Sequence, residues 1–201
     1  MVQGSPVEVA QKFFSLLERE RWEEAAALVD QNWLVSFQEE QAPMLAAAGR
    51  SLAQPSYGAG RLSSAPSDSE AIRKTVAEFG NAPVSPLGRA RTIAQLLALS
   101  ANDFFARYLE VRAEVRAGAN PPSLRTSWRV IGESLRNDSV AQIRYEYEGP
   151  VLTEHDRPGD MRTLIMHHQG GTWYCAPGQD LSEPWFGSLI EAREMMRRPS
   201  R

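Results

Sequence analysis

The chain has 201 residues, of which 42% are hydrophobic and 23% are charged, and its formal net charge is −3. This composition excludes an intrinsically disordered chain, because it supplies enough apolar side chains for a core and little net charge repulsion. No run of basic residues interrupts positions 1–190, so nucleic acid is not an expected partner.

The amino-terminal segment predicts a helical hairpin. Ser5 is followed by Pro6 at the first helical position and by Glu8 three residues after the cap, a pattern that satisfies the free amides of a helix start. A second helix is predicted over 22–29, where strong helix formers precede a stop at Asp30. In the first helix, apolar side chains recur at helical spacing, at Ala10, Phe13, Phe14 and Leu17.

The middle of the chain predicts an insertion over 38–100 that is partly mobile. Its first part is rich in Ala, Ser, Gly, Pro and Gln, and residues 54–69 show neither helical nor alternating periodicity. Ser67 and Glu70 repeat the capping spacing, and they predict a short helix that ends at Gly80.

A longer helix is predicted after the insertion. An apolar stretch over 93–99 leads to Ser100, which is expected to cap a helix that ends at Gly118. One face of this helix carries Phe104, Tyr108, Val111 and Val115.

The last third of the chain changes to alternating periodicity and predicts strands from about residue 125. Asn137 and Asp138 are expected to form the turn of a first hairpin, with Arg136 opposite Ser139. A shift by one residue would mix the two faces of this hairpin. Its small and aromatic face is expected to pair Ser134, Gly132, Val130 and Trp128 with Ala141, Ile143, Tyr145 and Tyr147.

A second hairpin is predicted around Gly170 and Gly171. The connection over 149–160 is expected to be a loop over the sheet edge, with the position of a lid, and residues 182–198 predict a short amphipathic helix. The expected pairs of the second hairpin are Gln169 with Thr172, His168 with Trp173, His167 with Tyr174 and Met166 with Cys175.

Helices followed by antiparallel hairpins predict the α+β class. We expect helices that cover one face of a curved antiparallel sheet of four or more strands. The expected organisation is a single domain over 1–180 and a tail with a short helix over 181–201.

The order of these elements resembles the nuclear transport factor 2-like superfamily, which includes SnoaL-like polyketide cyclases and ketosteroid-isomerase-like proteins. The resemblance rests, in this order, on PVEVAQKFFSLLERERWEEAAALVD, DFFARYLEVRAEV, SWRVIGESL, SVAQIRYEYEG, MRTLIMHH and GTWYCA. It implies a cystatin-like cone with a pocket open at one end and frequent dimerisation through the sheet. The segment over 38–100 is longer than the strand and helix that such proteins have there.

The resemblance also implies which side chains line the pocket. Aromatic rings with polar tips suit an apolar small molecule that carries one or two oxygens. The alternative interpretation is a set of core residues whose polar atoms bond to backbone or water. Besides the apolar stripes of the helices, the implied lining residues are Trp128, Val130, Ile143, Tyr145 and Tyr147.

A buried carboxylate, which catalytic members of the superfamily often use, is not evident from the sequence. Glu146 and Glu148 fall on the polar face of the first hairpin, where Glu146 meets Arg129. We interpret Asp30 as a helix stop. This pattern argues against steroid-isomerase chemistry, which needs a base with a raised pKa.

His167 and His168 are adjacent on a strand, so their side chains point to opposite faces and at most one enters the pocket. Beside Tyr174 or Trp173, such a histidine would act as an acid or base near neutral pH. The alternative is a hydrogen-bonded histidine of the sheet. His167, His168 and Tyr174 complete the candidate ligand-binding residues, and no catalytic residue is assigned.

No metal and no cofactor are expected. The single cysteine, Cys175, excludes an internal disulfide and a multi-cysteine metal site, and its surroundings indicate core packing. His155, Asp156 and Asp160 offer hard ligands, but at loose spacing and without a further histidine. No glycine-rich stretch follows a strand and opens a helix, as a nucleotide site would require.

Two functions are compatible with these observations. The first is a SnoaL-like small-molecule-binding domain, for which lyase, isomerase or cyclase activity stays open and a noncatalytic role is favoured. The second is a noncatalytic subunit that assembles through the sheet, the insertion or the tail, where Trp185 and Phe186 would contact a protein partner or a second copy in a homodimer. Because a leader and a long apolar stretch are not found, we expect a cytoplasmic location without membrane contact.

Overall fold

The computed structural model describes residues 4–54, 65–66, 68–119, 126–149, 159 and 161–197. The chain divides into two compact units, each built from two separate stretches. The first unit contains residues 1–34 and 116–183, and the second contains residues 35–115 and 184–201.

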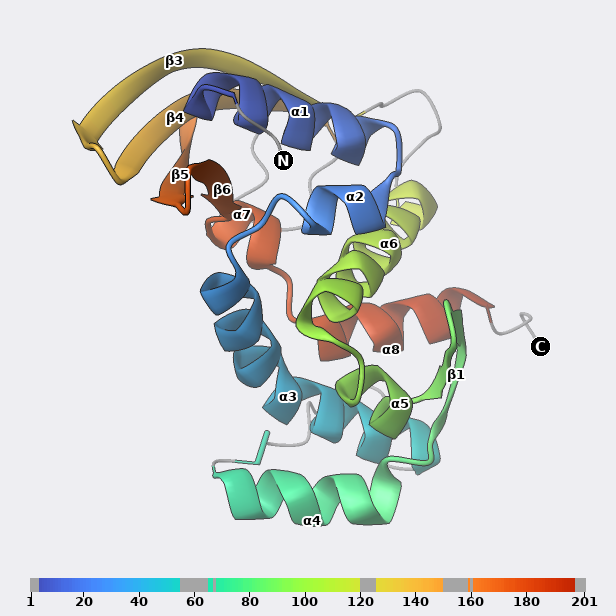
Figure 1. Ribbon diagram of the computed structural model, residues 1–201. Coiled ribbons are helices and arrows are strands. Elements are labelled where there is room, and N and C mark those ends of the chain that lie inside the picture. Colours follow the sequence, from blue (N-terminus) through green and yellow to red (C-terminus); the bar gives the residue numbers. More distant parts are fainter. Residues whose placement is uncertain are drawn as a thin grey trace. The chain divides into compact units, whose positions relative to one another are not determined.

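The first unit combines helices with one antiparallel sheet, whose strands follow the order β3-β4-β5-β6 (Figure 1). This arrangement confirms the α+β class and the four antiparallel strands. The elements of this unit are α1 (Pro6–Glu18), α2 (Trp22–Ala26), β3 (Ser127–Asn137), β4 (Val140–Glu148), β5 (Met161–Gln169), β6 (Thr172–Ala176) and α7 (Gln179–Ser182).

Helix α1 begins as predicted. The hydroxyl of Ser5 accepts a hydrogen bond from the amide of Glu8, and the Glu8 carboxylate accepts one from the amide of Ser5, so both capping bonds are present. The helix packs on β3, β4 and β6, with the strands curving past it (Figure 1). It buries Val9, Phe13, Phe14 and Leu17 in that contact.

The register of the first hairpin is as predicted only at its open end. Trp128 pairs with Tyr147 and Val130 with Tyr145, but Gly132 pairs with Arg144 rather than Ile143. The predicted pairs nearer the turn are therefore wrong. Their error has a physical cause, because one extra residue in β3 forms a bulge after Val130 and shifts every later pair.

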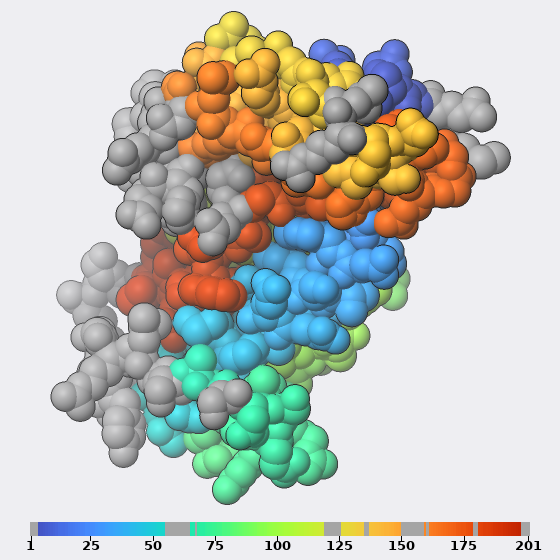
Figure 2. Space-filling model, turned by 90° about the vertical axis from the view of Figure 1, so that its left-hand side faces the viewer, coloured from blue at the N-terminus to red at the C-terminus, as the bar shows by residue number. Residues whose placement is uncertain are grey.

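The turn of this hairpin is also displaced from its predicted position. Asp138 and Ser139 form the turn, and Asn137 pairs with Val140. The side-chain oxygen of Asn137 accepts a hydrogen bond from the amide of Ser139 at 2.8 Å, which stabilises the turn from outside it. Figure 2 shows the strands of the sheet, coloured yellow to orange, at the surface of the unit.

The second hairpin has the predicted register in all four pairs, from Gln169 with Thr172 to Met166 with Cys175. Gly170 and Gly171 both have positive φ angles, of 57° and 81°, which a two-residue turn of this hand requires.

A short extended segment adds to the edge of β6. Val29 forms a parallel bridge with Cys175, and the amide of Asp30 donates to the carbonyl of Cys175 at 2.8 Å. Helix α2 consequently ends at Ala26 rather than at the predicted residue 29, because the chain must extend to reach the strand.

The second unit consists of helices and a two-stranded antiparallel hairpin. Its core contains an aromatic cluster with ring-centroid distances of 5.0–6.1 Å, formed by Phe37, Phe104, Phe105, Tyr108 and Phe186. The elements are α3 (Gln31–Ala53, from residue 35), α4 (Ser69–Phe79), β1 (Pro83–Leu87), β2 (Ala90–Thr92), α5 (Ile93–Leu97), α6 (Ala101–Ala119, to residue 115) and α8 (Phe186–Arg197).

Helix α3 corrects the prediction for the start of the insertion. Residues 38–53 are helical, although Pro43 lies inside them and cannot donate a backbone hydrogen bond. Strong helix formers dominate this stretch and outweigh the proline.

The other boundaries in this unit differ more modestly. Asp68 caps α4 through the amide of Ala71, whereas the predicted cap, Ser67, lies outside the described residues. Ser100 accepts from the amide of Asp103, which confirms the predicted cap of α6. Helix α8 begins at Phe186 rather than at residue 182, and the hairpin of β1 and β2 is not indicated by alternation, because Pro83 and Pro86 occupy β1.

Most of the predicted mobile segment over 54–69 and of the predicted loop over 149–160 lies outside the described residues. Within the described part of the chain, none of the helices combines the length and the apolar character that crossing a membrane requires.

Candidate functional site

Most of the predicted pocket residues share the sheet face that α1 covers. The ladder pairs place Trp128, Val130, Tyr145 and Tyr147 on one side, because directly opposed residues of antiparallel strands share a face. Phe14 of α1 stacks on Trp128 at 5.9 Å and lies 4.7 Å from the ring of Tyr145. Ile143, Tyr145 and Tyr147 are almost fully buried in this contact.

Trp128 differs from its neighbours in the state of its polar atoms. Its backbone amide donates to the carboxylate of Glu18 at 3.1 Å. Its indole nitrogen is buried and forms no hydrogen bond with any residue that the structure describes. A buried indole N–H that lacks a hydrogen-bond partner can donate to an acceptor that comes within reach.

The predicted histidines lie on opposite faces, as expected from their adjacency. The ring of His168 packs against Trp173 at 4.8 Å, on the side that α1 covers. His167 and its cross-strand partner Tyr174 are on the other side. The candidate residues are therefore divided between two faces and do not form one cluster.

The structure adds Asp30 to the candidate residues, on the face of the sheet that carries His167. Its carboxylate is buried, at 2% exposure, and His167 approaches it with Nδ1 at 2.9 Å from Oδ2. Gln169 donates from its side-chain amide to the same oxygen at 2.6 Å. The other oxygen, Oδ1, accepts from the amides of Asn32 and Trp33 at 2.8 and 3.1 Å. Asp30 is thus both the cap of α3 and the centre of a four-donor cluster.

The local sequence explains how these groups meet. His167 and Gln169 are two apart on β5 and so point to the same face. The parallel bridge of Val29 with Cys175 brings the following residue, Asp30, beside the strand pair on that face. A buried carboxylate is tolerated here because each oxygen has two donors.

The charge state of Asp30 follows from this environment. Burial raises the pKa of the Asp30 carboxyl, but the hydrogen bonds from His167, Trp33 and Asn32 outweigh burial and hold the pKa below its usual value. Asp30 is therefore ionised at neutral pH and can only accept hydrogen bonds. It follows that Nδ1 of His167 carries the proton.

The opposite nitrogen of His167 is available for chemistry. The side chain of His167 is 38% exposed, and Nε2 forms no hydrogen bond with a described residue. In the neutral imidazole that has its proton on Nδ1, Nε2 carries a lone pair and can accept a proton from a bound molecule. The carboxylate of Asp30 would then stabilise the imidazolium cation.

The sequence did not identify this pair. Asp30 looks like a helix stop, and 137 positions separate it from His167. The sequence feature that could have identified Asp30 is its position at the start of a further helix, because backbone amides hold a capping aspartate in a fixed orientation.

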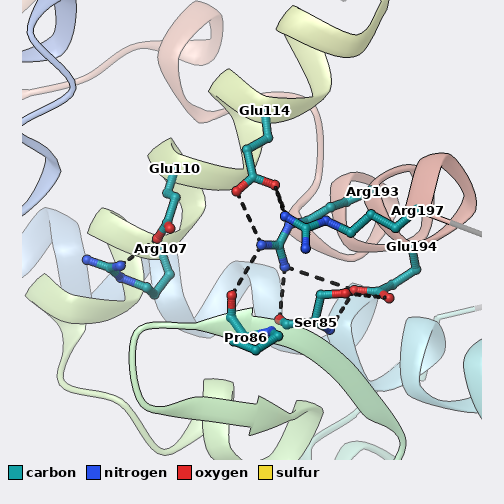
Figure 3. A network of polar contacts seen from close by, with 8 residues as sticks. All are labelled: Ser85, Pro86, Arg107, Glu110, Glu114, Arg193, Glu194 and Arg197. Atoms are coloured by element: carbon teal, nitrogen blue, oxygen red, sulfur yellow. Dashed lines mark hydrogen bonds and ion pairs between the residues drawn. The ribbon is translucent and has the colours of Figure 1, made fainter.

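A second polar cluster lies in the second unit (Figure 3). Arg193 of α8 is buried and forms two bonds to the carboxylate of Glu114 on α6, at 2.5 and 3.2 Å. It also donates to the carbonyls of Ser85 and Pro86 at 2.9 and 3.2 Å. We call these residues, together with Glu194 and Arg197, the Arg193 cluster.

The polar groups of the Arg193 cluster form their hydrogen bonds with one another. Glu194 accepts from the amide and hydroxyl of Ser85, and Arg197 donates to Glu114 at 3.2 Å. Burial raises the pKa of the Glu114 carboxyl, but the two arginines outweigh burial and lower the pKa below its usual value. Such a network fixes α8 to β1 and α6. Because its groups are used in these bonds, the pair of Asp30 and His167 is the better candidate for chemistry.

Comparisons with protein-family models, with curated proteins and with solved structures found no match to this chain.

Proposed function

We propose that this protein binds an apolar small molecule with oxygen substituents and transfers a proton within it, as lyases and isomerases do. The observation that supports the proposal is the 2.9 Å contact between the buried carboxylate of Asp30 and Nδ1 of His167. A lone histidine of the sheet would not need a buried carboxylate that four donors hold in place.

The surroundings of His167 support the class of substrate. On the same face, Val140 is directly opposite on β4 and Ile165 is two residues away on β5, and both are half-buried. These side chains offer apolar contact beside the base, while Tyr174 on β6 offers a polar tip.

In the proposed reaction, Nε2 of His167 removes a proton from a carbon atom of the substrate. The electron pair of the broken C–H bond forms a new double bond or moves to an adjacent oxygen. The imidazolium then returns the proton to a leaving group or to another carbon, with Asp30 ionised throughout. Membership of the nuclear transport factor 2-like superfamily is part of this proposal, and the helices that precede four antiparallel strands support it.

His167→Gln is expected to lower the rate of proton abstraction at this site. The probe is 5-nitrobenzisoxazole, whose ring opens to a coloured phenolate when a base removes its C–H proton. We expect a loss of at least about 10-fold, since a positioned general base contributes on the order of 10²–10⁴ toward its own substrate. Absorbance at the phenolate band measures the rate.

Two controls separate catalysis from folding in this experiment. Thr163→Val alters the same strand away from the pair and should retain the wild-type rate. Added imidazole should restore activity to His167→Ala, because it replaces the missing base. Equal rates for the wild type and His167→Gln would contradict the proposed function.

A second candidate function is that of a noncatalytic assembly subunit. Trp185, Met195 and Met196 of the second unit are exposed at 43%, 58% and 47%, and all three lie on or directly before α8. Large exposed apolar side chains in one segment are typical of contact surfaces.

The double variant Trp185→Ser, Met196→Gln tests this second function. If α8 mediates a homodimer, light scattering after size-exclusion chromatography should show the mass of a dimer for the wild type and of a monomer for the variant. A wild-type monomer at every concentration would argue against self-assembly through this segment.

A further inference from the structure

Tyr174 is the polar residue closest in register to His167. The two are directly opposite each other on β6 and β5, and they share the face on which Asp30 lies. Tyr174 is half-buried, and its hydroxyl forms no hydrogen bond with a residue in the described ranges. Gln169, another polar neighbour on that face, already donates to Asp30.

The register determines how far apart the two functional groups can be. Side chains directly opposite in an antiparallel pair have Cβ atoms about 4.5–5.5 Å apart. A phenol ring and an imidazole ring projecting from such a pair extend in the same direction from the sheet. One small molecule lying on this face can therefore contact the Tyr174 hydroxyl and Nε2 of His167 together.

We propose that Tyr174 is the second catalytic residue of this site and donates a hydrogen bond to the substrate oxygen on which negative charge develops. This inference rests on the proposed function. As His167 takes the proton, the electron pair of the C–H bond moves through the substrate to that oxygen, and the Tyr174 hydroxyl stabilises it. The substrate therefore carries an oxygen that either is conjugated to the acidic carbon or leaves from the atom bonded to that carbon.

The chemistry of 5-nitrobenzisoxazole matches this requirement. Its C–H bond breaks and the proton moves to His167, the carbon–nitrogen bond becomes a nitrile, and the N–O bond breaks. The electron pair of the N–O bond remains on the phenolate oxygen, which is the atom that Tyr174 would contact. The reaction requires no oxidant, reductant or further reactant.

Tyr174→Phe removes only the hydroxyl and tests the inference. We expect the rate of ring opening to fall about 10-fold, below the 10²–10³-fold typical of a donor acting on its natural substrate. The pH dependence of the remaining rate should stay that of the wild type, because His167 is intact. In the His167→Gln background, Tyr174→Phe should change nothing further.

The outcomes distinguish the inference from the function on which it rests. Thr163→Val, on β5 and four residues from His167, is again the folding control and should keep the wild-type rate. A loss in His167→Gln with an unchanged rate in Tyr174→Phe would overturn the role of Tyr174 alone. No loss in His167→Gln would overturn both proposals, whatever Tyr174→Phe does.

Discussion

Glu114→Gln is expected to reduce the free energy of unfolding by about 3 kcal/mol, because it leaves the buried cation of Arg193 without its closest anion. Gln retains the shape of the side chain and one acceptor, so the loss isolates charge from packing. Glu194 remains 4.0 Å from Arg193 and keeps the effect at the lower end of the usual range for buried pairs. Urea denaturation followed by circular dichroism measures the change.

Arg197→Gln is the matched control for this variant. Arg197 contacts the same carboxylate, but its side chain is 49% exposed, and exposed pairs contribute about 0–1 kcal/mol. Equal losses from Glu114→Gln and Arg197→Gln would contradict the importance of the buried cation.

The carboxylates of Asp30 and Glu114 make the free energy of unfolding depend on pH. The pKa values of Asp30 and Glu114 are both lowered in the folded state, so the unfolded chain binds protons first as the pH falls. Their stabilising contribution is complete above the ordinary carboxyl pKa of about 4 and is lost as the pH falls through the lower folded values. In Glu114→Gln, this loss between neutral and acidic pH should be smaller than in the wild type.

Phe14→Ala is expected to cost about 3–5 kcal/mol in the first unit, as large-to-small substitutions of buried aromatic residues do. Phe14 is 2% exposed and lies between Trp128, Tyr145 and the neighbouring Phe13. The substitution removes the ring from this buried contact and leaves a cavity beside Trp128 and Tyr145. Tryptophan fluorescence during urea denaturation reports the change, because Trp128 is the stacked partner.

Gln11→Ala serves as the control, since Gln11 lies on the exposed side of α1. Such a surface substitution should stay within about 0.5 kcal/mol of the wild type. A loss below about 1 kcal/mol for Phe14→Ala would show that α1 is not held to the sheet by this ring.

Local chemistry explains which parts of the fold could be predicted from the sequence. The capping residues Ser5 and Ser100 and the glycine turn after Gln169 are short-range signals, and the structure confirms each of them. The bulge after Val130 has no such signal, because alternation alone assigns each residue a single partner. The prediction missed the helix over 38–53 because it took Pro43 and the small residues of this stretch as loop signals, although alanine is the strongest helix former.

The candidate site was only half predictable for a different reason. His167 and Tyr174 come from one hairpin, and their pairing follows from the turn. Asp30 reaches them through a parallel bridge between segments far apart in the chain, and periodicity cannot reveal such a bridge. Whether the aromatic residues opposite α1 bind a ligand stays a prediction, while their burial against Phe14 is observed.

Each compact unit is assembled from an early and a late stretch of the polypeptide. During synthesis, α1 therefore leaves the ribosome long before the strands that cover Phe14 exist, and Glu114 emerges before its partner Arg193. Neither core can close until the carboxy-terminal portion has been translated, which exposes apolar surface to chaperones and proteases for most of that time. Premature termination before residue 184 would deprive the second unit of α8 and leave Glu114 without its buried cation.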